Sequence, residues 1–278
     1  MEHGWTRFLE LLPPWLREAV DRHPGAETQL RQLRLRVKQP PAGDFPGGCR
    51  VMAARSVTGE DLECVLGRAS GYGAYSCIGL NQGYISAPGG HRVGVCGTVV
   101  VKDGAVTGMR EVTSVCIRVA RDYPGCAAKV LPGLWGSALL LGVPGSGKTT
   151  LLRDVCRQLA KTAAVAVADE RGELFPEGMD RLGVDVLTGC DKARGVDMLL
   201  RTMSPQVIAV DEITRAEDCR RLLEAAGCGV RLLATAHGRD RLDLRRRPVY
   251  RELLEAGIFD RLVLVNGPGK YETEGFIQ

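Results

Sequence analysis

An apolar run that leads into a glycine-rich turn and a lysine constrains the fold more than any other feature of the chain. Residues 137–141 read Ser-Ala-Leu-Leu-Leu, and residues 142–149 follow the pattern Gly-x-x-x-x-Gly-Lys-Thr. The apolar run predicts a buried strand, and the Leu-Leu-Arg-Asp sequence at 151–154 predicts a helix directly after the turn. A strand, this turn and a helix in succession predict a phosphate-binding loop, or P-loop, in an α/β fold.

The residue types in this loop suit a nucleotide triphosphate. A curved backbone with few side chains can surround phosphate oxygens with N–H groups, and glycines allow that curvature. The Lys148 ammonium can lie between the β- and γ-phosphates, and the Thr149 hydroxyl can bind Mg²⁺. The chain is therefore expected to bind ATP or GTP with Mg²⁺. The residues expected to line the nucleotide are Gly142, Val143, Pro144, Gly145, Ser146, Gly147, Lys148, Thr149 and Thr150.

Length and composition indicate a globular protein of two domains. The chain has 278 residues, of which 45% are hydrophobic and 25% charged, so neither disorder nor a fibrous repeat is indicated. A net charge of +4 is too small to indicate nucleic-acid binding by itself. The ten cysteines include no Cys-x-x-Cys pair, and scattered thiols favour a reducing cytoplasm. No apolar run approaches the roughly 18 residues of a membrane span, so any membrane association is expected through a partner.

The pattern of the sequence changes near residue 125, where we place the domain boundary. Residues 1–125 mix short helices with alternating strands and predict an α+β domain, with a turn at 102–104 and a helix capped by Thr58. Prolines and glycines at 40–48 predict a loop. Strands and helices alternate over residues 126–278, which predicts a mostly parallel sheet covered by helices. Ligands of such sheets bind at the carboxyl ends of the strands.

A second apolar strand, at 207–210, ends in Asp211 and Glu212. This is the pattern of a Walker B strand, in which Asp211 would join Thr149 in holding Mg²⁺ and Glu212 would orient the water that attacks the γ-phosphate. The alternative is a solvated strand end or a helix cap. A carboxylate at position 212 favours hydrolysis over binding alone.

Two further strands are predicted to end in polar residues at the same edge. One leads into Asp169, Glu170 and Glu173, which could tune Mg²⁺ or water, although they could also be ordinary charges of a surface loop. The other carries Thr235 and His237, which could sense the γ-phosphate through hydrogen bonds. A single histidine after a strand is more often structural.

Several blocks of the sequence resemble those of the secretion-type traffic ATPases, the hexameric RecA-like motors of type II and type IV secretion and pilus machines. The matching blocks are spread over about two thirds of the chain, and within that superfamily they resemble a sporulation family of endospore-forming bacteria. They lie at 89–97, 115–121, 147–154, 168–174, 201–213, 234–238 and 247–248.

The resemblance implies a RecA-like P-loop ATPase domain behind a smaller N-terminal α+β domain. It implies that 169–173 is the acidic box, that His237 belongs to a histidine box, and that ATP is the nucleotide. It also implies that Arg92 and Arg118 act on the phosphates as arginine fingers do, with Arg201 and Arg215 as weaker candidates. Both arginines could instead be ordinary polar residues of alternating strands. The resemblance further implies a homo-oligomer, a hexamer, that serves a membrane channel complex in sporulation from the cytoplasmic, mother-cell side.

The stretch 239–247 departs from the family pattern because it is rich in arginine where related motors carry another histidine. Aspartates between these arginines favour a solvated or intersubunit loop, and nucleic acid is not expected as a partner.

Two other functions stay open from the sequence. One is a nucleic-acid-dependent RecA-like ATPase, although the sequence shows no basic groove lined with aromatic residues for stacking single strands. The other is a scaffold that binds ATP to assemble and hardly hydrolyses it.

Overall fold

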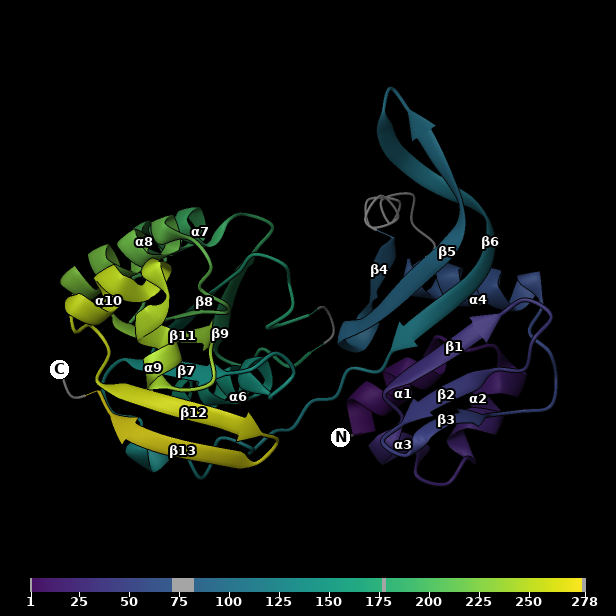
Figure 1. The fold of residues 1–278 in the computed structure, drawn as a ribbon, viewed down its shortest axis with the longest axis horizontal. Helices are drawn as coiled ribbons and strands as arrows, with labels where there is room; N and C mark the ends of the chain where they lie inside the picture. The colour runs from purple at the N-terminus through teal and green to yellow at the C-terminus, as the bar shows by residue number, and fades with distance from the viewer. Residues whose placement is uncertain (1, 72–82, 177–178, 277–278) are drawn as a thin grey trace. The chain divides into compact units, whose positions relative to one another are not determined.

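The computed structural model describes residues 2–71, 83–176 and 179–276. The chain divides into two compact units, Met1–Asp122 with Pro176–Met179 and Tyr123–Phe175 with Asp180–Gln278, and each has its own sheet (Figure 1). Among the helices of the described ranges, none has the length and apolar character needed to cross a bilayer.

The first unit is an antiparallel sheet of six strands in the order β3-β2-β1-β6-β5-β4, packed with short helices. Thr58 caps α4 through a reciprocal pair of hydrogen bonds with Asp61, as predicted. The elements are α1 (Glu2–Glu10), α2 (Pro14–Asp21), α3 (Ala26–Gln29), β1 (Gln32–Arg36), β2 (Ala42–Phe45), β3 (Gly48–Val51), α4 (Gly59–Ala69), β4 (Tyr84–Ala87), β5 (His91–Lys102) and β6 (Ala105–Arg118).

The prediction of a loop at 40–48 was wrong in part, because β2 occupies Ala42–Phe45 and β3 begins at Gly48. Gly43 lies within this strand, and a Cβ there would come within 2.8 Å of Leu30 and 2.6 Å of Met52. Phe45 ends the strand and is buried in the core of the unit. Glycine is therefore required here by close packing between neighbouring side chains, a cause that the local sequence does not reveal.

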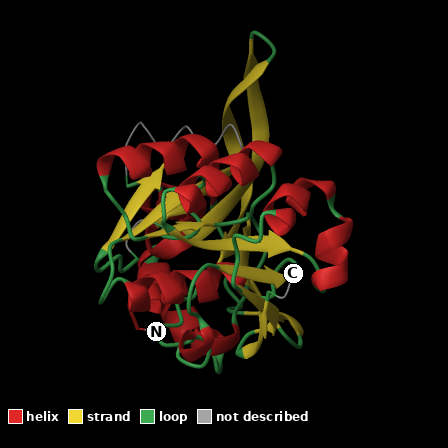
Figure 2. Ribbon diagram, turned by 90° about the vertical axis from the view of Figure 1, so that its left-hand side faces the viewer, coloured by secondary structure: helices red, strands yellow, loops and turns green. Residues whose placement is uncertain are grey.

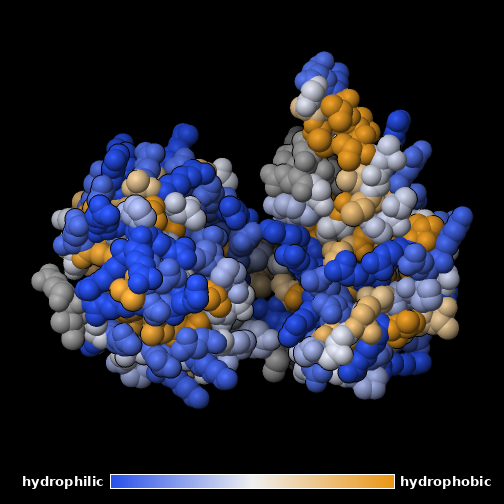
Figure 3. All heavy atoms as spheres, viewed as in Figure 1, coloured by the Kyte–Doolittle hydropathy of each residue, from blue (hydrophilic) through white to orange (hydrophobic). Residues whose placement is uncertain are grey.

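The outer halves of β5 and β6 form a long two-stranded ribbon, visible in Figure 2. Asp103 and Gly104 make its turn with φ values of 52° and 77°, which confirms the predicted turn. Apolar side chains gather on this ribbon (Figure 3): Val99 is 47% exposed and Val101 is 60% exposed. The sequence pattern, which indicates only an ordinary strand there, did not predict this exposed surface.

His91 is a buried, neutral member of the first unit. Its side chain is 1% exposed, its Nδ1 accepts the Ala120 N–H at 3.0 Å, and its Nε2 therefore donates to the Gly4 carbonyl at 3.0 Å. Burial lowers the pKa of His91 from 6.5 to about 4, because the charged imidazolium would lose its hydration. The sequence did not mark this histidine as structural.

The first unit is expected to lose stability as pH falls from 6.5 toward 4. The unfolded chain binds a proton at His91 in this range and the folded chain does not, so about 3 kcal/mol present above pH 6.5 is lost by pH 4. Urea unfolding at a series of pH values would measure it in a Trp135→Phe background, where Trp5 and Trp15 report on this unit. A free energy of unfolding that does not change with pH would contradict the assignment.

The second unit is a sheet of seven strands in the order β13-β12-β7-β11-β10-β8-β9, parallel except for β13. The predicted alternation of strands and helices is confirmed, and the edge strands β9 and β13 were not predicted. The elements are β7 (Ala138–Gly142), α6 (Lys148–Leu159), β8 (Val165–Asp169), β9 (Val184–Thr188), α7 (Lys192–Thr202), β10 (Val207–Val210), α8 (Ala216–Gly227), β11 (Arg231–His237), α9 (Arg241–Arg246), α10 (Arg251–Glu255), β12 (Arg261–Gly267) and β13 (Lys270–Gly275).

Helices cover both faces of this sheet because successive strand residues point to opposite sides. In β7, Leu139 and Leu141 pack in the cluster with α7, α8 and α10, whereas Ala138 and Leu140 pack in the cluster with α6. The inner strands β7, β8 and β10 are buried along their whole length, as expected of a parallel sheet covered on both sides. The parallel strands β7, β8, β10 and β11 therefore bring their following loops to one edge.

Candidate active site

Glycines shape the loop between β7 and α6. Gly145 and Gly147 have φ values of 76° and 101°, in the left-handed region that other residues rarely adopt. Gly142 is required by space, because a Cβ there would lie 2.5 Å from the Ser146 Oγ and 2.6 Å from the Val265 carbonyl oxygen. The loop is therefore packed closely against β12 at Gly142, and its turn depends on the left-handed conformations of Gly145 and Gly147.

Lys148 begins α6 and directs its ammonium back over this loop. Its Nζ donates to the carbonyl oxygens of Gly142 at 2.9 Å and Val143 at 3.0 Å, and to Nδ1 of His237 at 3.2 Å. Burial lowers the pKa of Lys148, and the charges of Asp211 and Glu212 oppose that change. The charges of the two carboxylates therefore favour the charged form of Lys148.

His237 links Lys148 to Glu212. Since its Nδ1 accepts from the ammonium, its Nε2 carries the hydrogen and donates to Oε1 of Glu212 at 3.0 Å. Lys148, His237 and Glu212 come from α6, β11 and the segment after β10. The fold thus places three of the predicted site residues in one hydrogen-bonded row.

Asp211 and Thr149 also meet. The Thr149 hydroxyl donates to Oδ2 of Asp211 at 2.8 Å, which brings together a hydroxyl and a carboxylate oxygen. Both are hard oxygen ligands of the kind that Mg²⁺ prefers. The next residue, Glu212, has φ 56°, a strained conformation for a residue that is not glycine.

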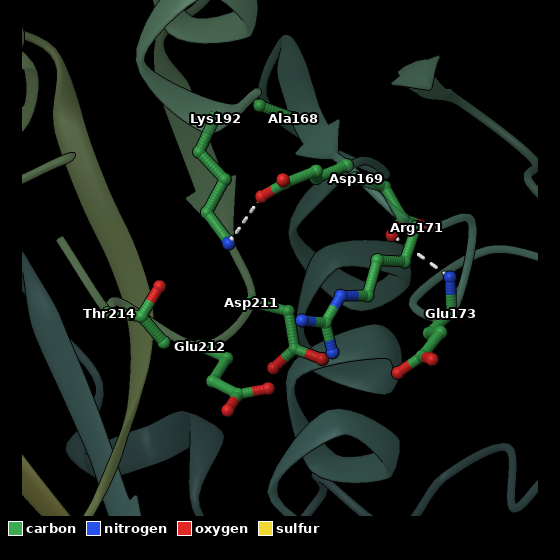
Figure 4. Close-up of a pocket in the computed structure, with 9 residues that line it drawn as sticks. Ala168, Asp169, Arg171, Glu173, Lys192, Asp211, Glu212 and Thr214 are labelled. Carbon is green, nitrogen blue, oxygen red and sulfur yellow. Dashed lines mark hydrogen bonds and ion pairs between the residues drawn. The ribbon is translucent and has the colours of Figure 1, made fainter. Parts of the chain in front are cut away.

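The residues after β8 line a pocket beside these carboxylates (Figure 4). Asp169 is buried and accepts N–H groups of residues 173, 174 and 175 at 2.9–3.0 Å, so it shapes the loop. Burial raises the pKa of Asp169, and these bonds oppose the rise. Glu170 pairs with Lys192 at 2.8 Å and with Arg215 at 3.8 Å, and the Lys192 hydrogen bond lowers its pKa. Glu173 also lines this pocket.

Two basic residues of this pocket had no predicted role. Lys192 begins α7, is 8% exposed and pairs with Glu170. Arg171 extends into the pocket between Asp211 and Glu173 in the view of Figure 4. No sequence motif marks Lys192, and only the N-cap Asp191 before it indicates that a helix begins there.

Arg92 and Arg118 lie together in the first unit. They are directly opposite each other in the register of β5 and β6, so their side chains share a face, and Arg92 also stacks over the Tyr84 ring at 4.2 Å. Like charges directly opposite each other disfavour a strand pair, and an anion bound between them would offset the repulsion. Arg201, the weaker candidate, pairs with Asp197 at 3.1 Å within its own helix.

Comparison with known proteins identifies the family. The model of the family "Sporulation stage III, protein AA" matches residues 6–276. The chain belongs to this family. It is 37% identical to stage III sporulation protein AA of Bacillus subtilis (strain 168), over 97% of this chain and 96% of that protein.

Two solved structures share the fold of this stage III AA chain. The ATPase DotB of Legionella pneumophila matches 90% of this chain and 78% of its own at TM-score 0.62 and 17% identity. The pilus retraction motor PilT with bound ADP matches 93% and 77% at TM-score 0.63 and 18% identity. The fold is therefore a RecA-like P-loop ATPase domain with a smaller N-terminal α+β domain, as predicted.

Proposed function

We propose that this chain is a Mg²⁺-dependent ATPase that works as a hexameric ring and serves a membrane channel complex in sporulation. The observation that carries the proposal is the convergence of two groups of side chains at the edge of one sheet. Lys148, His237 and Glu212 form one hydrogen-bonded row, and Asp211 bonds to Thr149, the residue after Lys148. The sporulation role follows the name of the family and of its Bacillus subtilis relative.

The residues present fit a magnesium nucleotide. The buried Oγ of Ser146 has no hydrogen-bond partner within the described part of the chain, and it lies in the glycine loop that would receive the phosphates. Thr149 and Asp211 would hold Mg²⁺, which when bound neutralises the charge that develops on the phosphate oxygens. Lys148 would contact the phosphates in place of its own loop carbonyls.

Glu212 would orient the attacking water and accept its proton. Its Oε1 accepts a hydrogen bond from His237, which holds the carboxylate in one direction, and the same imidazole faces Lys148. His237 would therefore sense any movement of Lys148 toward phosphate. Glu173 and Glu170 would act through the neighbouring pocket, with Glu170 held by Lys192.

We assign residues 1–125 to an N-terminal domain that acts on nucleotide bound by residues 126–278. Arg92 and Arg118 share one face and would bind an anion together, which supports their role as arginine fingers on the γ-phosphate. Hydrolysis would then change the angle between the domains, and membrane proteins of the channel would receive that motion. In this proposal the ring is cytoplasmic, on the mother-cell side, and peripheral to the membrane.

The test is ATP turnover with Mg²⁺ and with EDTA, together with the mass in solution with and without a non-hydrolysable ATP analogue. We expect turnover only with Mg²⁺ and a mass near six chains with the analogue. A chain that binds ATP and assembles but never hydrolyses it, even with membrane partners, would be a scaffold. A large, salt-sensitive increase in turnover on single-stranded DNA would favour the nucleic-acid-dependent ATPase.

A further inference from the structure

Thr235 contacts each of the first three residues after β10. It lies in β11 directly after Ala234, which pairs with Val210, the last residue of β10. Its hydroxyl donates to Oδ1 of Asp211 at 2.6 Å and accepts the Glu212 N–H at 2.7 Å, and its carbonyl accepts the Ile213 N–H at 2.9 Å. Thr235 is fully buried at 0% exposed, so its contacts are made inside the protein.

The roles of these bonds follow from the chemistry of the groups. A backbone N–H can only donate, so the Thr235 oxygen accepts from Glu212, and its single hydrogen is left for the Asp211 carboxylate. With Oδ1 of Asp211 held by Thr235, Oδ2 is directed at the Thr149 hydroxyl. One buried hydroxyl therefore sets which carboxylate oxygen faces the loop.

The second bond acts on the backbone of Glu212. Its φ of 56° is unfavourable for a residue with a side chain and persists only where neighbours hold it. Thr235 and His237 are two residues apart on β11 and lie on one face of that strand. The first holds the Glu212 N–H and the second holds its carboxylate, at 2.7 Å and 3.0 Å.

We propose that Thr235 is a positioning residue for the proposed reaction. It orients Asp211 toward the metal and holds Glu212 in the left-handed conformation that directs its carboxylate to His237. This differs from the expected sensing of the γ-phosphate by Thr235, because the hydroxyl already bonds to Asp211 and Glu212. The inference rests on the proposed magnesium nucleotide site.

The test measures how much Mg²⁺ strengthens binding of a fluorescent ATP analogue, mant-ATP, compared with EDTA. Thr235→Val should reduce that gain about 10-fold to 100-fold, the usual effect of removing a group that orients a metal ligand, while affinity in EDTA stays within about 2-fold. Thr235→Ser keeps the hydroxyl and should restore most of the gain. Thr235→Ala repeats the test without placing an apolar methyl group against Asp211.

The controls separate this inference from the proposed function. Thr188→Val, at the exposed end of β9, should leave the affinity for mant-ATP unchanged both with Mg²⁺ and in EDTA. If the parent protein gains nothing from Mg²⁺, the proposed function fails, and this inference fails with it. If the parent gains and Thr235→Val gains equally, or if Thr235→Ser loses as much as Thr235→Val, the proposed function stands and Thr235 is not a positioning residue.

Discussion

Glu212→Gln is expected to lower ATP turnover by about 10²- to 10⁴-fold while ATP binding remains. Glutamine has the shape of glutamate and its Oε1 can still accept from His237, but it cannot accept a proton from water. Lys148 and Thr149 are unchanged, so the phosphates and Mg²⁺ keep their proposed contacts. Phosphate release and mant-ATP binding, measured on the same protein, test both parts, and assembly with a non-hydrolysable analogue should persist.

The matched control is Glu217→Gln, which makes the same chemical change at the exposed start of α8. It should keep normal turnover. If Glu212→Gln also hydrolysed ATP at the parent rate, another group would have to orient the water. Glu173, which lines the same pocket, would then be the next candidate.

Lys148→Ala is expected to weaken ATP binding by about 100-fold or more, which corresponds to roughly 3 kcal/mol. Lys148 is 6% exposed and its ammonium lies over the loop, so its hydrogen bonds to phosphate would form away from most of the water. Removing it also takes away the partner of the His237 Nδ1. Titration with mant-ATP measures the loss.

Lys161→Ala is the matched control, because this exposed lysine lies just past the other end of the same helix, where its Nζ bonds to Gln158. It should bind ATP as the parent does. Normal affinity in Lys148→Ala would mean that the glycine loop does not bind the phosphates through this lysine.

Most of the second unit could be predicted from the sequence because its signals are local. The strand that ends at Gly142, the turn and the helix from Lys148 follow one another within a few residues, and each has its own pattern. The strand before Asp211 was equally clear from its apolar run. Elements at the sheet edges were not, since β9 is only partly buried and β13 is mostly exposed.

Features of the first unit that have non-local causes could not be predicted. The strand at Ala42–Phe45 depends on how Gly43 fits against Leu30 and Met52. The neutral state of His91 depends on Gly4 and Ala120, which lie 87 and 29 residues away in the chain. In each case, the deciding partner lies far from the residue in the sequence.

By itself, the sequence determined which residue types stand at the strand ends or in the segments that follow them: Lys148, Asp211, Glu212 and His237. The tertiary structure decided how they meet. Parallel strands bring these ends to one edge, and only then does His237 bridge Lys148 and Glu212. The part played by Thr235 has the same origin, because hydrogen bonds depend on distances of about 3 Å that sequence spacing does not encode.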